Sequence, residues 1–243
     1  MILDIYKDAF EYSAKDWKTL LILGVICLFS FLLIPLFLIT GYNYRVVNTA
    51  VHGIINGRDP LPDFDDVISM FIDGVKVVII QIIYLIVPVI TFIVFILIAS
   101  QLSGALKSTV VLIGCLATLI LGIIAFLMIQ MGICHMAYND GAFTKAFAFK
   151  EIKDVINEIG VFECILTYAG IIIICVVLSV VVTGITGLIF TVFGISGSIL
   201  GVGAGGILLL GTLVNAIITT FIVGPYLSIF AGRSIGLLYT MQI

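Results

Sequence analysis

The chain has 243 residues, of which 62% are hydrophobic and only 10% are charged, and its formal net charge is −3. Its mean hydropathy of +1.34 is far above that of water-soluble domains, whose surfaces need charged side chains. This composition excludes a soluble globular domain, and the slightly acidic balance excludes a broad basic surface for nucleic acid. We therefore expect an all-α integral membrane protein with membrane lipid, and not nucleic acid, as its surroundings.

Membrane spans are predicted from four stretches without Asp, Glu, Lys or Arg, the last of which runs for 69 residues from Cys164 to Gly232. Each of the first three stretches holds one span of about 20 residues, and the last holds two. The sequence thus predicts five transmembrane helices at residues 19–40, 76–100, 108–133, 161–183 and 206–230.

A glycine-rich segment at 184–205 separates the last two predicted spans. Each glycine inside a helix costs about 1 kcal/mol relative to alanine, so the segment favours a turn or a re-entrant loop. Its apolar residues are also numerous enough to cross the membrane, and six spans remain the alternative.

Amphipathic helices are predicted at 1–17, within the loop 41–75 and within 135–160, because apolar residues recur there at i, i+3, i+4 and i+7. In the third of these, Ile152, Val155, Ile156 and Ile159 form the apolar stripe. Beside membrane spans, such helices are expected to lie in the interface with the apolar face toward lipid. Packing on a partner protein is the alternative. Residues 231–243 are expected to form a tail after the last span.

Orientation is predicted from the Lys and Arg residues on each side of the five spans. Four lie on the side of the N-terminus (Lys7, Lys15, Lys18 and Lys107), and seven lie on the other side (Arg45, Arg58, Lys76, Lys145, Lys150, Lys153 and Arg233). The excess places the loops 41–76 and 135–160 in the cytoplasm of a cell-membrane protein.

The most patterned segment is the acidic one between Gly57 and Gly74. Asp63, Asp65, Asp66 and Asp73 suggest either a carboxylate cluster that holds Mg²⁺ against a lipid phosphate or the cap of a helix. The prolines at 60 and 62 favour an extended course, after which Asp63 would cap the helix and the next acids would favour its positive end. The capping interpretation is the simpler one.

Catalytic, cofactor and metal sites are not indicated elsewhere. The five cysteines lie in or beside apolar runs without metal-ligand spacing, and no ionisable residue falls in the middle of a predicted span. Neutral polar residues are the remaining candidates within the spans, and such residues commonly bind neighbouring helices together. They are Gln81, Tyr84, Gln130, Asn215, Thr219 and Thr220.

A candidate structural motif comprises Gly41, Tyr42, Arg45, Gly57, Leu61, Pro62, Asp63, Phe64, Asp66, Asp73 and Gly74. All of these except Asp63, together with Lys76, Tyr84 with Pro88, the segment 146–152, and Arg233 with Gly236 and Tyr239, match a known pattern. By these residues the chain resembles a multi-pass membrane family of archaea and bacteria, domain-of-unknown-function family four thousand and thirteen. The resemblance implies a small prokaryotic membrane protein of one domain and leaves its activity open.

Three functions are therefore considered. The first is a non-enzymatic membrane protein that organises lipid, or docks protein partners or further copies of itself, through its interfacial helices. The second is a transporter or flippase for an uncharged or amphiphilic solute, although no charge inside the membrane is present to couple transport. The third is an interfacial enzyme that acts on lipid phosphate through the acids between Asp63 and Asp73.

Overall fold

The computed structural model describes residues 2–199 and 204–242, and every regular element in these two ranges is helical. The prediction of an all-α protein is confirmed. The elements are α1 (Ile2–Ser13), α2 (Trp17–Leu28), α3 (Leu33–Val51), α4 (Val67–Ser100), α5 (Gly104–Tyr138), η1 (Phe143–Phe147), α6 (Phe149–Ile159), α7 (Val161–Ile199), α8 (Ala204–Ile218), η2 (Thr219–Val223), α9 (Gly224–Tyr239) and η3 (Thr240–Gln242).

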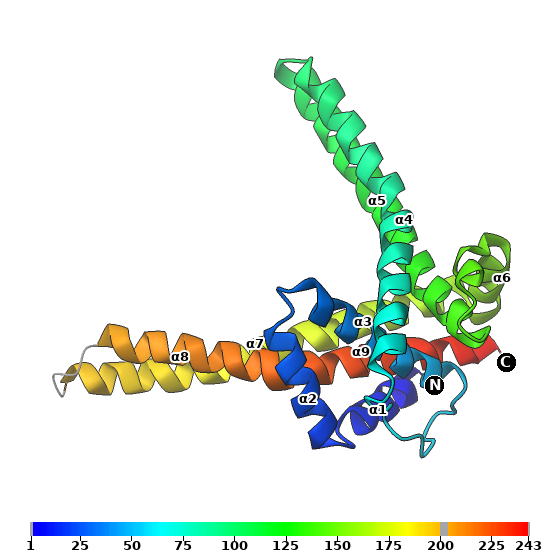
Figure 1. The fold of residues 1–243 in the computed structure, drawn as a ribbon. Coiled ribbons are helices and arrows are strands. Elements are labelled where there is room, and N and C mark those ends of the chain that lie inside the picture. The colour runs from blue at the N-terminus through cyan, green and yellow to red at the C-terminus, as the bar shows by residue number, and fades with distance from the viewer. Residues whose placement is uncertain (1, 200–203, 243) are drawn as a thin grey trace.

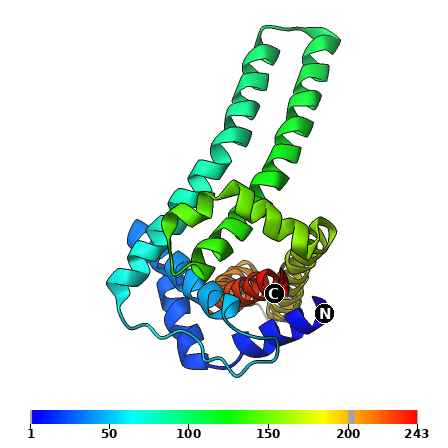
Figure 2. The same ribbon diagram turned by 90° about the vertical axis from the view of Figure 1, so that its right-hand side faces the viewer.

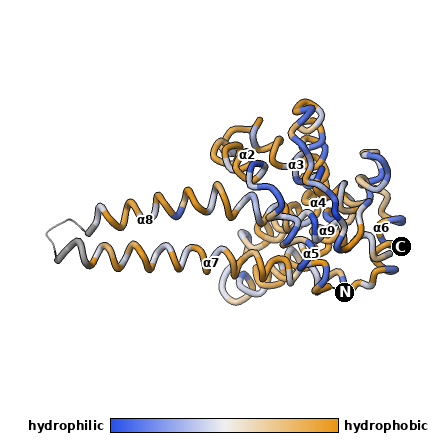
Figure 3. The backbone as a smooth tube through the Cα atoms, turned by 90° about the horizontal axis from the view of Figure 1, so that it is seen from below, coloured by the Kyte–Doolittle hydropathy of each residue, from blue (hydrophilic) through white to orange (hydrophobic). Residues whose placement is uncertain are grey.

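Four helices in the described ranges are long and apolar enough to cross a membrane. They pair into two hairpins, α4 with α5 and α7 with α8, and these leave a common base in different directions (Figures 1 and 2). Apolar residues dominate the α7–α8 hairpin, whereas polar residues gather near the termini and α6 (Figure 3). The four apolar helices are Val67–Ser100, Gly104–Tyr138, Val161–Ile195 and Gly205–Tyr239, the last of which is continuous through α8, η2 and α9.

The range predicted as the first span, 19–40, is not one helix. It is divided between α2 and α3 by a tight turn, in which the Leu32 N–H donates to the Phe29 carbonyl at 2.9 Å. Pro35 accounts for the division, because it fits the first turn of α3 but would remove a backbone hydrogen bond from a continuous helix. The described ranges thus contain four apolar helices of spanning length, and the prediction of five or six spans is not confirmed.

The predicted turn at 184–205 is helical over most of its length, because α7 continues to Ile199. In lipid, a helix satisfies all its backbone groups internally, and this outweighs the cost of the glycines. Residues 200–203 of the predicted turn lie outside the described residues, and its last two residues begin α8.

The base contains α1, α3, α9 and the inner ends of α4, α5 and α7, and both termini lie beside it (Figure 1). Its core is made of fully buried side chains from elements far apart in the sequence, including Ile80, Met136, Phe230 and Leu238. The short helix α2 joins the base where it crosses η2. A Cβ on Gly24 would overlap the backbone of Phe221, so the two helices touch there.

The apolar stripes of α1 and α6 are covered by the base itself. The stripe of α6 is at most 9% exposed, and α6 contacts α5, α7 and α9. In α1, Ile5 and Ala9 are fully buried. The expectation that these apolar stripes face lipid is therefore wrong, because each stripe packs against neighbouring helices of the base. The position of both helices at the membrane surface stays a prediction.

Candidate functional site

The Arg45 side chain holds the acidic segment by binding the backbone carbonyls of that segment rather than its carboxylates. The guanidinium donates to the carbonyl oxygens of Asp63 (3.1 Å), Asp65 (2.7 Å) and Asp66 (2.9 Å). Its contact with the Asp65 carboxylate is longer, at 3.6 Å, and that side chain is 85% exposed. Three acceptors on one planar group fix the course of the chain into α4.

The cap of α4 is Asp66 and not Asp63. Its Oδ1 accepts the Ser69 N–H at 3.1 Å, and its φ of +47° places it in the left-handed region just before the helix. The preceding residues are held outside the helix, because Arg45 binds the carbonyls of Asp63 and Asp65 and the ring of Phe64 stacks on that of Tyr42, with centroids 4.8 Å apart. The helix thus begins three residues later than a cap at Asp63 would require.

Gly41 and Gly74 mark the point where α3 and α4 cross. A Cβ on Gly41 would overlap the Met70 carbonyl oxygen, and a Cβ on Gly74 would overlap that of Phe37. The two backbones are in direct contact, which only glycine allows at both positions.

The remaining motif residues also have structural partners. The Gly57 N–H closes a turn onto the Ile54 carbonyl at 2.9 Å, and Asp73 forms an ion pair with Lys76 at 3.2 Å. Leu61 is buried in the base, while Pro62 lines a shallow surface depression beside Arg45. No group of three or more His, Cys, Asp and Glu side chains in the described ranges is placed to hold a metal ion.

A buried ionic group that the sequence did not reveal ties α9 to α1 and to the loop before α4. The fully buried Arg233 donates from Nε to Asp8 at 2.8 Å, and its NH1 lies 2.9 Å from Asp59. The second oxygen of Asp8 accepts the Asn56 N–H at 2.6 Å. Tyr12 covers the guanidinium, with its ring centre 4.5 Å away.

The surroundings of Tyr12 keep its hydroxyl protonated. Burial raises the pKa of Tyr12 to about 12, and the nearby Arg233 offsets part of the increase. The hydroxyl donates to the Pro60 carbonyl at 2.9 Å, so it fastens the loop to α1. This ionic group has the features of a structural anchor, since Arg233 and Asp8 are buried as a pair and the partly exposed Asp59 adds a second partner.

A second polar group attaches α6. Glu151 accepts from the Lys145 Nζ at 2.7 Å and contacts His135 Nε2 at 2.9 Å, while His135 Nδ1 contacts the Tyr239 hydroxyl at 2.6 Å. The Lys145 ammonium first, and His135 second, hold the pKa of Glu151 below its ordinary value.

The lowered pKa of Glu151 predicts a loss of stability in acid. A carboxyl group whose pKa is lower in the folded state stabilises that state above the pKa of the unfolded chain, about 4.3, and the contribution is lost as the pH falls further. We expect the melting temperature of Glu151→Gln to fall less than that of the unsubstituted protein between about pH 5 and pH 3. Glu158→Gln, at an exposed position of the same helix, is the control. Its melting temperature should fall as much as that of the unsubstituted protein over the same pH range.

Some of the neutral polar side chains within the spans form hydrogen bonds with other segments of the protein, and others do not. The Tyr84 hydroxyl donates to the Ala146 carbonyl at 2.8 Å, and Thr186 donates to the Asn215 side chain at 2.7 Å. These two contacts bind segments of the protein together, as expected for such residues. The side chains of Gln81 and Gln130 make no hydrogen bond within the described ranges.

Gln81 and Gln130 instead line a cavity of about 280 Å³ where α3, α4, α5 and α9 meet, which we call the polar pocket. One further group at this pocket is buried without a hydrogen-bond partner in the described ranges, namely Asn43 Oδ1. Tyr44 also lines the pocket, but its hydroxyl pairs with the Asn48 side chain. Its other lining residues are Thr40, Val47, Val77, Ile133, Ser228, Ala231, Gly232 and Ile235.

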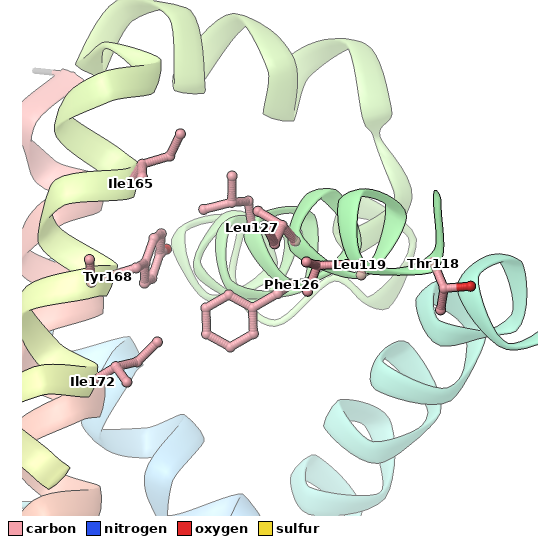
Figure 4. Close-up of a pocket in the computed structure, with 10 residues that line it drawn as sticks. Thr118, Leu119, Phe126, Leu127, Ile165, Tyr168 and Ile172 are labelled. Atoms are coloured by element: carbon pink, nitrogen blue, oxygen red, sulfur yellow. The ribbon is translucent and has the colours of Figure 1, made fainter. Parts of the chain in front are cut away.

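A larger cavity of about 540 Å³ lies between α5 and α7, and we call it the apolar groove (Figure 4). Phe126 of α5 and Tyr168 of α7 meet edge to face across it, with ring centres 5.6 Å apart. Its other lining residues are Thr118, Leu119, Gly122, Ile123, Leu127, Ile165, Ala169 and Ile172.

The fold and these cavities define an all-helical membrane protein with two apolar hairpins on a helical base. The chain belongs to the family described as Protein of unknown function (DUF4013), whose profile matches residues 28–191. It is similar to Uncharacterized protein MJ1189 of Methanocaldococcus jannaschii, with 32% identity over 239 residues that cover 94% of this chain and 77% of that protein. No solved structure matches the chain. The family predicted from the motif is thus confirmed.

Proposed function

We propose that this protein is a non-enzymatic, multi-pass protein of the cell membrane that organises lipid around its two hairpins. The observation that carries the proposal is how little of the hairpins the protein covers. Within the most apolar window of each long helix, only 6–17% of the residues are buried. Nearly the whole surface of the spans is therefore available to lipid chains.

The lengths of the hairpins also fit lipid. α5 has 35 residues and measures about 52 Å at 1.5 Å per residue, whereas the hydrocarbon core of a bilayer is about 30 Å thick. A helix whose length exceeds the thickness of the hydrocarbon core crosses the bilayer at a tilt. The two hairpins leave the base in different directions (Figure 1), and each is proposed to cross the membrane at its own tilt.

The pair α2–α3 is proposed to enter the same membrane face without crossing. Its turn presents large apolar side chains, with Phe31 79% exposed and Leu33 70% exposed. α2 has 12 residues, or about 18 Å, which reaches roughly half the depth of the hydrocarbon core.

Four spans change the charge balance that sets orientation. With α2–α3 not crossing, Lys107 near the tip of the α4–α5 hairpin stands alone on one side, and the other ten of the eleven Lys and Arg residues lie on the side of the base. The five-span prediction had seven against four. The positive-inside rule therefore favours a cytoplasmic base that includes both described ends of the chain.

A spin label tests whether lipid surrounds the hairpins. In a variant without cysteines, a nitroxide at Val180→Cys, where Val180 is 64% exposed, should be readily accessible to oxygen in phosphatidylcholine vesicles and show no coupling between copies. The control is Ile171→Cys on the same helix, where the side chain is 5% exposed and accessibility should be low. Strong coupling between labels at 180 would show that further copies, rather than lipid, cover the hairpin.

A further inference from the structure

The polar pocket and the apolar groove share one face of α5. Phe126 and Leu127 line the groove, and Gln130 of the polar pocket follows them by four and three residues. Residues with these spacings are neighbours on a helix, one turn or about 5 Å apart along its axis. The stripe therefore changes from apolar to polar as α5 enters the base.

We propose that the fork between the two hairpins binds one uncharged amphiphile, whose hydroxyl-bearing head occupies the polar pocket and whose hydrocarbon chain lies in the apolar groove. The proposal rests on the proposed placement of the hairpins in lipid. It adds to that placement a specific site and the chemical class of its ligand.

The free hydrogen-bonding groups of the polar pocket suit hydroxyls. Each glutamine amide offers a carbonyl acceptor and two N–H donors, and Asn43 offers a free carbonyl oxygen. A hydroxyl both donates and accepts, so it can pair with every one of these groups. Leaving a buried acceptor such as Asn43 Oδ1 unpaired is costly, which is why a ligand is expected there.

An anionic head is disfavoured, because none of the described lining residues is a cation. Lys76 lies on α4 near Val77 of the pocket wall, but it is paired with Asp73 at 3.2 Å. Placing a phosphate or a carboxylate among neutral groups would bury a charge without a partner, which is far more costly than burying a hydroxyl.

The apolar groove suits a hydrocarbon chain. Leu119 and Ile123 of α5 face Ile165 and Ile172 of α7 across a volume of about 540 Å³, within the range of small-molecule sites. The groove lies on the stretch of α5 whose outer side chains are exposed, such as Leu116 and Ile120, and a chain can therefore enter it from the surrounding lipid.

A photoreactive lipid tests the site in the full-length protein. A monoacylglycerol with a diazirine in its acyl chain is added to the protein in phosphatidylcholine nanodiscs, and the crosslinked peptides are identified by mass spectrometry. We expect crosslinks concentrated at 118–127 of α5 and 165–172 of α7. Unlabelled monoacylglycerol should compete, and the free fatty acid of the same chain should compete at least about tenfold more weakly.

Substitutions separate the head from the chain. Gln81→Leu with Gln130→Leu should weaken competition by monoacylglycerol about tenfold or more, whereas Gln101→Leu, the same change at the exposed hairpin turn, should have no effect. Ala169→Phe fills the groove without touching the polar pocket and should also remove the crosslinks. It provides a second variant should the double substitution fail to fold.

The outcomes distinguish the proposed site from the proposed function. Crosslinks spread evenly along both hairpins, without competition, would overturn the site and leave the lipid exposure of the hairpins intact. Equal competition by the fatty acid would overturn the assignment of an uncharged head. An absence of crosslinks from both hairpins would contradict the lipid placement as well.

Discussion

Arg233→Met is expected to lower the free energy of unfolding by about 3–5 kcal/mol, because it leaves Asp8 and Asp59 without their cation inside the base. The Asp8 side chain is only 4% exposed, so water cannot replace the guanidinium. Denaturant unfolding of the purified protein in detergent, followed by helical circular dichroism, measures the loss. Addition of Asp8→Asn should recover part of it, since one of the two uncompensated charges is then removed.

Arg58→Met is the matched control. Arg58 lies in the same loop as Asp59, is exposed and has no ion-pair or hydrogen-bond partner in the described ranges. Exposed substitutions of this kind usually change stability by no more than about 0.5 kcal/mol. If Arg58→Met and Arg233→Met gave equal losses, the ionic group would not be the anchor that joins α1, the loop and α9.

Gly41→Ala is expected to cost about 1–3 kcal/mol, because the added methyl group forces apart the backbones of α3 and α4 at their crossing. Gly122→Ala on α5 is the opposite case, since nothing lies within 4 Å of its added Cβ. There the added methyl group meets nothing, and the better helix propensity of alanine should stabilise by no more than about 0.5 kcal/mol, since glycine costs less in lipid than in water. Thermal unfolding of both variants in one detergent would measure the contrast, and the same sign for both would contradict a backbone contact at Gly41.

The apolar hairpins could be predicted from the sequence, because charge-free runs of this length have no place in a soluble fold. The number of helices of spanning length could not be predicted, although the first apolar run contains Pro35. A proline can kink a spanning helix or begin a new one, and the packing of α2 against η2 decides which. The glycines from residue 184 onward led to the prediction of a turn where α7 is helical. Helix propensities measured in water overstate the cost of glycine in lipid.

The buried ionic group had one signal in the sequence. Asp8 follows Ile5 by three residues and precedes Tyr12 by four, so it lies on the apolar face of α1 and not on the charged face. An acid at such a position needs a partner. That partner, Arg233, is 225 positions away and could not be identified from one sequence.

The polar pocket could be predicted only in part from the sequence. Gln81 and Gln130 were among six neutral candidates in the spans, and the sequence could not show which of the six would find partners. Pairing of the others depends on tertiary contacts, such as the approach of the Ala146 carbonyl to Tyr84. Two glutamines on different helices become one site only when the crossing of α3, α4, α5 and α9 is known.

The side of the membrane on which the N-terminal helix lies tests the four-span account most directly. Single cysteines at Lys7, Lys107 and Glu158, all exposed, would be placed in a cysteine-free variant and treated with a membrane-impermeant maleimide in intact cells. The account predicts labelling of position 107 alone until the membrane is permeabilised, after which positions 7 and 158 react as well. Labelling of position 7 together with 107 in intact cells would show that 19–40 crosses the membrane and would contradict the account.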